Sequence, residues 1–161
     1  MADVRRVFEN AGFGEVRSLL QSGNLVFDAG EADDAAIETT IEQALFAELG
    51  LRTEVIVRCG EAWRAMIAAN PFPDEAKADP SHLVAMVLKM APPASADEAL
   101  SAAAGPERVH LTEACAYIYY PEGIADSRLI GSVLDRALGV RGTGRNWNTV
   151  QKLAVLAGAQ P

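Results

Sequence analysis

Hydrophobic positions recur along the chain with two different periods, and these periods predict its helices and strands. Apolar residues three and four positions apart are typical of one face of a helix, whereas alternating or short continuous apolar runs are typical of strands. Helices are predicted over residues 3–11, 31–49, 61–70, 95–104 and 126–138 and from residue 147 onward. Strands are predicted over residues 16–21, 25–28, 53–58, 83–90, 108–112, 115–120 and 140–144.

Some of these segments carry further signals. The acidic stretch 31–34 is expected to cap the second helix, and Gly50 to end it. Asp126 is expected to cap the helix over 126–138, with Ile130 and Val133 among its inward residues. The run 83–90 is almost continuously apolar, which predicts a strand covered on both faces.

The order of the predicted elements repeats. Residues 83–145 follow the order β-α-β-β-α-β, which is typical of a ferredoxin-like unit. Residues 3–58 follow the order α-β-β-α-β, the same pattern without its opening strand. We therefore expect an α+β fold of two tandem ferredoxin-like repeats plus a C-terminal helix. In that fold the opening strand lies inside the sheet, so its loss leaves a slot.

A change in composition suggests where the repeats meet. Proline and acidic residues gather between Pro71 and Ser81. We expect an N-terminal α+β lobe over residues 1–72, a linker over 73–81, and a C-terminal lobe with the terminal helix over 82–161.

Overall composition indicates a globular protein in a reducing compartment. Half of the 161 residues are apolar and 22% are charged. No apolar run approaches the ~20 residues that span a bilayer, and the N-terminus does not resemble a signal peptide. Cys59 and Cys115 lie far apart, without metal-ligand spacing. We expect a cytoplasmic protein with reduced thiols, no membrane partner and no cofactor; an oligomer is compatible with the sequence.

Charge is distributed unevenly along the chain. The net charge of −8 argues against general nucleic-acid binding, yet residues 128–161 carry five Lys/Arg and only Asp135, a balance of +4. This basic segment either forms a local anion site or neutralises the acidic remainder of the chain.

The candidate binding residues begin in this basic segment. Arg145, Asn146, Asn148 and Thr149 surround the predicted start of the last helix, where backbone amides and the helix dipole favour anions. Gly142 and Gly144 are expected to let the chain turn there. The alternative is structural: Arg145 pairs with a carboxylate and Asn146 caps the helix. Trp147 is expected to point into the core.

A second group of candidates lies at the predicted hairpin tip. Gln21, Ser22 and Asn24 can present polar atoms to a small anionic or nucleotide-like ligand, within reach of Arg145 if the two lobes pack together. Turn chemistry alone also explains Ser22-Gly23-Asn24.

No catalytic or metal-binding pattern is recognisable. His82 and His110 are isolated in sequence from any nucleophile or acidic partner that would specify a triad, and each is interpreted as an ordinary surface or strand-end histidine. The tyrosines 117, 119 and 120 are interpreted as packing residues, since an RNP-type motif is absent. Whether the protein is an enzyme is therefore left open, and the lack of a recognisable catalytic constellation favours a protein that is not an enzyme.

Four stretches together resemble the bacterial family called domain of unknown function 1697. They are Leu20–Phe27 (LQSGNLVF), Asn70–Phe72 (NPF), Tyr120–Leu129 (YPEGIADSRL) and Arg145–Val150 (RNWNTV). The resemblance extends over essentially the whole chain. The family usually opens with a hydrophobic strand and an Arg/Gly-rich turn, which this sequence lacks. We therefore expect an N-terminally shortened chain, in agreement with the repeat pattern.

Three classes of function remain open from the sequence. They are a binding module for a small anionic or nucleotide-like ligand, an enzyme using the same pocket, and a protein–protein or oligomer module. The family name implies no activity and so does not choose among them.

Overall fold

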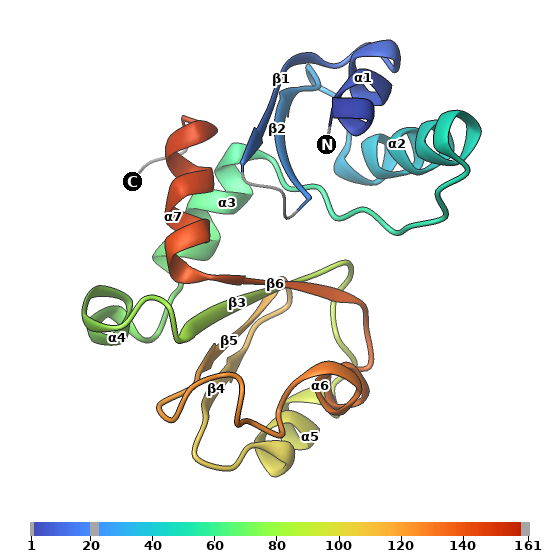
Figure 1. Cartoon of the computed structure of the whole chain (residues 1–161). Coiled ribbons are helices and arrows are strands. Elements are labelled where there is room, and N and C mark those ends of the chain that lie inside the picture. Colours follow the sequence, from blue (N-terminus) through green and yellow to red (C-terminus); the bar gives the residue numbers. More distant parts are fainter. Residues whose placement is uncertain (1, 20–22, 159–161) are drawn as a thin grey trace. The chain divides into compact units, whose positions relative to one another are not determined.

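The structure is a computed structural model that describes residues 2–19 and 23–158. Within these ranges the chain forms seven helices and two antiparallel sheets, a mixed α+β architecture (Figure 1). The chain divides into two compact units, residues 1–64 with 152–161 (unit 1) and residues 65–151 (unit 2). No helix in the described ranges is both long and apolar enough to cross a membrane.

Unit 1 is built on the antiparallel hairpin of β1 (Gly14–Leu19) and β2 (Asn24–Asp28), in which Leu19 lies opposite Asn24. Helices α1 (Ala2–Asn10) and α2 (Asp34–Leu49) contribute the apolar side chains that bury the hairpin. Three phenylalanine rings form part of this core, with centroid distances of 5.1 Å for Phe8–Phe27 and 4.9 Å for Phe13–Phe27. The hairpin predicted from the sequence is therefore present.

Helix α2 has the ends that its sequence specifies. The Asp33 carboxylate accepts a hydrogen bond from the Ala36 backbone amide at 3.3 Å, and Gly50 ends the helix in the left-handed conformation with φ 65°. A side-chain cap satisfies one of the free amides of the first turn, and glycine adopts positive φ without a Cβ clash. The helix begins at Asp34, and its cap, Asp33, lies within the acidic stretch 31–34 that was predicted to cap it.

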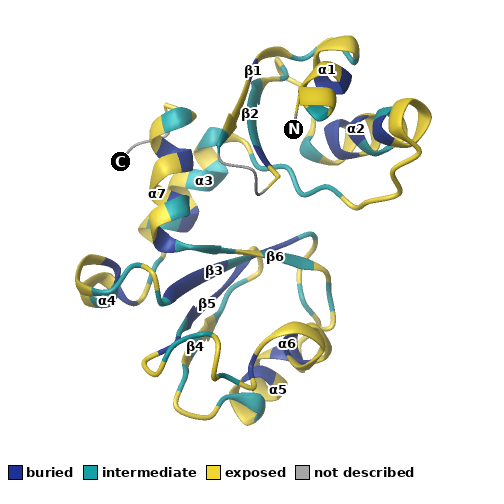
Figure 2. Ribbon diagram, in the orientation of Figure 1, coloured by how far each residue is buried: buried dark blue, intermediate teal, exposed yellow. Residues whose placement is uncertain are grey.

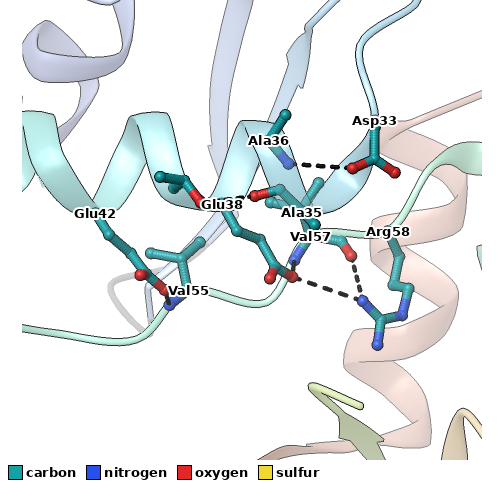
Figure 3. Close-up of polar contacts among 9 residues, drawn as sticks. Asp33, Ala35, Ala36, Glu38, Glu42, Val55, Val57 and Arg58 are labelled. Carbon is teal, nitrogen blue, oxygen red and sulfur yellow. Dashed lines mark hydrogen bonds and ion pairs between the residues drawn. The ribbon is translucent and has the colours of Figure 1, made fainter. Parts of the chain in front are cut away.

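The strand predicted over residues 53–58 does not form. These residues belong to no sheet, and carboxylates of α2 accept hydrogen bonds from two of their amides, which a neighbouring strand would otherwise accept. Glu42 Oε1 accepts from the Val55 amide and Glu38 Oε1 from the Val57 amide, each at 2.8 Å (Figure 3). Both valine side chains still pack against the unit 1 core. The β-branched residues of this segment therefore pack against the core without pairing in a sheet.

Glu38 is the buried acid of this arrangement, with only 7% of its surface exposed. Arg58 Nη1 lies 3.7 Å from Glu38 Oε1 and donates to the Val57 carbonyl at 2.5 Å (Figure 3). A buried carboxylate is costly unless it is paired and hydrogen-bonded, and here it is both. Glu38 therefore fixes residues 57–58 to α2.

Unit 2 holds a four-stranded antiparallel sheet in the order β4-β5-β3-β6. Its strands are β3 (Leu83–Leu88), β4 (Arg108–Leu111), β5 (Cys115–Tyr119) and β6 (Gly142–Asn146), and its remaining helices are α4 (Pro73–Ala78), α5 (Ala96–Ala103) and α6 (Gly131–Leu138). Helices α3 (Gly60–Ala68) and α7 (Trp147–Leu156) are each divided between the two units. The order β3-α5-β4-β5-α6-β6 is the order predicted from the sequence.

Strand β3 is the interior strand that its apolar run predicts. It pairs with both β5 and β6, five of its six residues are buried, and Figure 2 shows this burial along the strand. Val84 is 9% and Val87 3% exposed, so both faces of β3 are covered. The strand ends at Leu88, and Met90, which was included in the prediction, is 64% exposed.

Glycines in β6 make room for the side chain of Met86 on β3. A Cβ on Gly142 would lie 2.9 Å from Met86 Cγ and Sδ, and one on Gly144 would lie 3.3 Å from Met86 Cε. Met86 is paired with Gly144 in the sheet. The expectation that these glycines serve a turn is therefore wrong, because they serve close packing within a strand.

Helix α6 begins at Gly131 and not at Asp126. The preceding residues form a turn in which the Ser127 hydroxyl accepts from the Leu129 amide at 2.9 Å and donates to Glu107. Tyr120 Oη donates to the Leu129 carbonyl at 2.9 Å, which holds the same turn. Ile130 and Val133, predicted to face inward, are 41% and 40% exposed.

The stretch predicted as a linker, residues 73–81, contains α4.

Candidate functional site

One end of the unit 2 sheet gathers the polar residues of interest. Leu83, the first residue of β3, pairs with Tyr119 at the end of β5, and Val84 pairs with Asn146 at the end of β6. The Trp147 amide, which opens α7, donates to the Pro80 carbonyl at 3.0 Å. The loop before β3 and the first turn of α7 therefore lie side by side. We call this region, residues 79–82, 119–123 and 145–149, the sheet end.

The first turn of α7 is capped as one of the sequence-based alternatives predicts. Asn146 Oδ1 accepts from the Thr149 amide at 3.0 Å. Because the Trp147 amide is bound to Pro80, two of the first-turn donors already have partners within the chain. An anion bound here would therefore depend on side chains more than on these amides. The Asn148 residue is exposed.

Arg145 lies in strand β6, opposite Ala85, and not within the helix. Its Nη1 donates to Thr143 Oγ1 at 2.6 Å and to the Gly144 carbonyl at 2.8 Å. Burial lowers the pKa of the guanidinium, although arginine stays charged in proteins. These contacts hold a partly desolvated cation two residues before α7.

Trp147 is 3% exposed and Val150 is fully buried. The prediction that the indole points inward, away from the direction of Asn148, is confirmed. Side chains of adjacent helical residues point ~100° apart, so the Trp147 side chain is buried while that of Asn148 faces solvent.

Of the candidate binding residues at the hairpin tip, the structure describes Asn24. Gln21 and Ser22 lie outside the described residues. Asn24 opens β2 opposite Leu19 and is 7% exposed, which makes it a buried polar residue of unit 1. The role of Gln21, Ser22 and Asn24 in ligand binding stays a prediction.

An Asp–His pair at the sheet end was missed by sequence analysis, which treated His82 as isolated. His82 Nδ1 lies 2.8 Å from Asp79 Oδ2. Asp79 also accepts from Tyr119 Oη at 3.2 Å and from Ser81 Oγ at 3.2 Å. The spacing Asp79-x-x-His82 was visible in the sequence, but the approach of Tyr119 depends on the pairing of β3 with β5.

The electrostatics follow from these contacts. The hydrogen bond from His82, together with those from Ser81 and Tyr119, lowers the pKa of Asp79 against the opposing effect of desolvation. Desolvation, followed by the hydrogen bond to Asp79, raises the pKa of Tyr119. Asp79 is therefore a carboxylate at neutral pH, while Tyr119 is a protonated donor.

The far side of the His82 ring is open. The side chain is 42% exposed, and its Nε2 makes no hydrogen bond to the described residues. Gly123 has φ 92°, a conformation that favours glycine, and a Cβ placed there would lie 3.9 Å from Nε2. The turn after β5 therefore passes the ring without placing a side chain over it.

A charged pair adjoins this cluster. Arg108, which is paired with Tyr119 in the β4–β5 ladder, contacts Glu75 and places its guanidinium 4.7 Å from the centre of the Phe72 ring. The polar cluster thus continues from the loop before β3 to the edge strand β4.

Other candidates do not form a site with these residues. Cys115 is buried in β5, and Cys59 is exposed before α3. Within the described ranges, no group of three or more His, Cys, Asp or Glu side chains is placed to hold a metal ion. The sheet end therefore remains the candidate site.

Comparison with known proteins identifies the family. The family model for proteins of unknown function DUF1697 matches residues 1–117. A solved structure, described as a conserved bacterial protein from Streptococcus pneumoniae, superposes with a TM-score of 0.70 at 16% identity, covering 98% of this chain and 88% of that one. At this identity the likeness concerns the fold. A search of curated proteins gives no significant match. The chain belongs to the DUF1697 family.

Proposed function

We propose that the protein is a binding module for a small anionic or nucleotide-like ligand at the sheet end of unit 2. The observation that carries this proposal is the hydrogen bond from the Trp147 amide to the Pro80 carbonyl, which brings the first turn of α7 beside the His82 loop. Arg145 would supply positive charge, while Asn148 and His82 would supply exposed polar groups.

The charge of the surrounding chain supports an anionic ligand. The basic balance of residues 128–161 contrasts with the acidic remainder of the molecule. Within the sheet end Arg145 is the cationic side chain, and Asp79 and Glu122 are acidic. Arg145 can pair with one small anion, while the net negative charge of the protein repels extended polyanions. This favours a phosphate or carboxylate group over a nucleic acid.

A thermal-shift series tests the proposal. Inorganic phosphate, nucleoside monophosphates, sugar phosphates and dicarboxylates are added in turn, and a specific ligand should raise the melting temperature by mass action. Arg145→Ala and Asn148→Ala should each reduce the ligand-induced shift. Arg136→Ala, on the exposed face of α6, should retain it and serves as the matched control.

Stability must be separated from binding in this series. Trp147→Ala removes a buried indole and should cost about 3–5 kcal/mol. Arg145→Ala should cost less than this, because it removes polar contacts such as those to Thr143 and Gly144 and no buried ring. If Arg145→Ala unfolds the protein as severely as Trp147→Ala, or if every anion leaves the melting temperature unchanged, anion binding at this site is wrong.

We also propose that the two units are ferredoxin-like repeats. Unit 2 places its first strand, β3, between its third and fourth, and unit 1 follows the order α1-β1-β2-α2 before residues 53–58. Superposing α1-β1-β2-α2 on α5-β4-β5-α6 tests this idea. A repeat requires both helices to lie on the equivalent face of each hairpin, and opposite faces would refute it.

A further inference from the structure

We infer that the Asp79–His82 pair is a general-base site, in which His82 Nε2 takes a proton from a water or hydroxyl group and Asp79 is the positioning residue. The inference goes beyond anion binding, because a neutral molecule can reach Nε2 with no anion bound. It rests on three features of the described residues: an oriented ring, a supported carboxylate and an uncovered nitrogen.

The ring is oriented by its contact with Asp79. A carboxylate can only accept a hydrogen bond, so the 2.8 Å contact places the proton of neutral His82 on Nδ1. The lone pair then resides on Nε2, the nitrogen that faces outward. When Nε2 takes a proton, the adjacent carboxylate stabilises the imidazolium that forms.

Asp79 is itself held in place by neighbours from two elements. Tyr119 Oη on β5 donates to the same oxygen, Oδ2, that contacts His82, and Ser81 Oγ in the loop donates to Oδ1. The His82 carbonyl accepts from the Tyr120 amide at 2.9 Å, which ties the loop to β5. The remaining charges beside Tyr119 are Glu75 and Arg108, which pair with each other.

The His82 ring is open to solvent beside Gly123. Its side chain is 42% exposed, and the nearest approach of a Cβ placed on Gly123 would be 3.9 Å from Nε2, an ordinary van der Waals distance. His110 provides the contrast within the same chain. It lies on the edge strand β4, its ring centroid is 6.3 Å from that of Tyr117 with the two rings tilted, and no carboxylate among the described residues pairs with it.

Hydrolysis of p-nitrophenyl acetate is the probe reaction. Water gives a proton to His82 Nε2 while its oxygen bonds to the acetyl carbon, and the ester bond breaks with its electron pair leaving on p-nitrophenolate. The products are acetic acid, which ionises to acetate by releasing its proton to solvent, and p-nitrophenolate, and the imidazolium also returns its proton to solvent. Release of p-nitrophenolate is followed by absorbance, with the uncatalysed rate subtracted.

We expect His82→Ala to lower the protein-dependent rate about tenfold more than His110→Ala, a modest part of the 10²–10⁴-fold typical of evolved general bases. Asp79→Asn should also lower the rate, and ¹⁵N NMR of the wild-type ring should show the proton on Nδ1. Equal effects of the two histidine variants, or an Nε2-protonated ring, would overturn the inference.

The same experiment distinguishes this inference from anion binding. Hydrolysis of the neutral ester is measured without added anion, so an absent anion-induced thermal shift would leave it unaffected. Arg136→Ala, on the exposed face of α6, should leave this hydrolysis unchanged. Loss of hydrolysis in Arg136→Ala at an unchanged fold would show that the activity does not reside at His82 and would count against the assignment.

Discussion

Asp79 shows how single residues set the chemistry of the sheet end. Its two oxygens accept hydrogen bonds from three side chains, His82, Ser81 and Tyr119. Each of these bonds favours the ionised form of Asp79 over the protonated form. Protonation of Asp79 at low pH would therefore weaken its hydrogen bond to the His82 ring.

This link predicts a change in acid stability. Because the pKa of Asp79 is lower in the folded protein than its ordinary value of 3.8, its contribution to the free energy of unfolding is present above that value and is lost as pH falls through the lowered pKa. In Asp79→Asn, the free energy of unfolding should therefore fall less steeply below about pH 4 than in the wild type.

Urea unfolding at a series of pH values measures this slope. Asp74→Asn, at an exposed position of α4, is the matched control and should leave the slope close to that of the wild type. Identical slopes for the wild type and Asp79→Asn would show that the hydrogen bonds around Asp79 do not persist in solution.

At the scale of elements, the sequence predicts the helix ends and strands that depend on interactions between residues close in the chain. Asp33 and Gly50 specify the ends of α2 because caps and positive-φ glycines act within a few residues. The continuous apolar run of β3 likewise predicts an interior strand. Residues 53–58 have an equally strand-like composition, but whether they pair depends on what lies beside them. Two glutamates of α2 occupy that position.

This arrangement predicts the effect of removing Glu38. In Glu38→Ala the Val57 amide loses its carboxylate acceptor and Arg58 loses an ionic contact, so the free energy of unfolding should fall by about 1.5–3 kcal/mol. Hydrogen exchange should accelerate at the Val57 amide. Glu42→Ala should instead accelerate exchange at Val55, since Glu42 accepts from that amide. Unchanged exchange at both amides would contradict the contacts in Figure 3.

At the scale of the whole molecule, the family and the order of elements over residues 83–146 were predicted correctly from the sequence, whereas the prediction of a strand over residues 53–58 was wrong and the site was predicted only in part. The cap at Asn146 and the burial of Trp147 follow from helix periodicity, which the sequence displays. The Asp79-x-x-His82 spacing is local, but the approach of Tyr119 to Asp79 depends on the β3–β5 register, which pairs Leu83 with Tyr119 and has no local signal. The late start of α6 has the same origin, because Tyr120 holds the preceding turn through the Leu129 carbonyl.

The central claim is that the sheet end binds a small anion, and an NMR titration tests it most directly. Backbone ¹H–¹⁵N spectra are recorded while inorganic phosphate, and then a nucleoside monophosphate, is added at constant pH and ionic strength. Saturable shifts should concentrate in residues 79–82, 119–123 and 145–149 and should be lost in Arg145→Ala. Saturable shifts confined to other residues, or the absence of any saturable shift, would contradict the account.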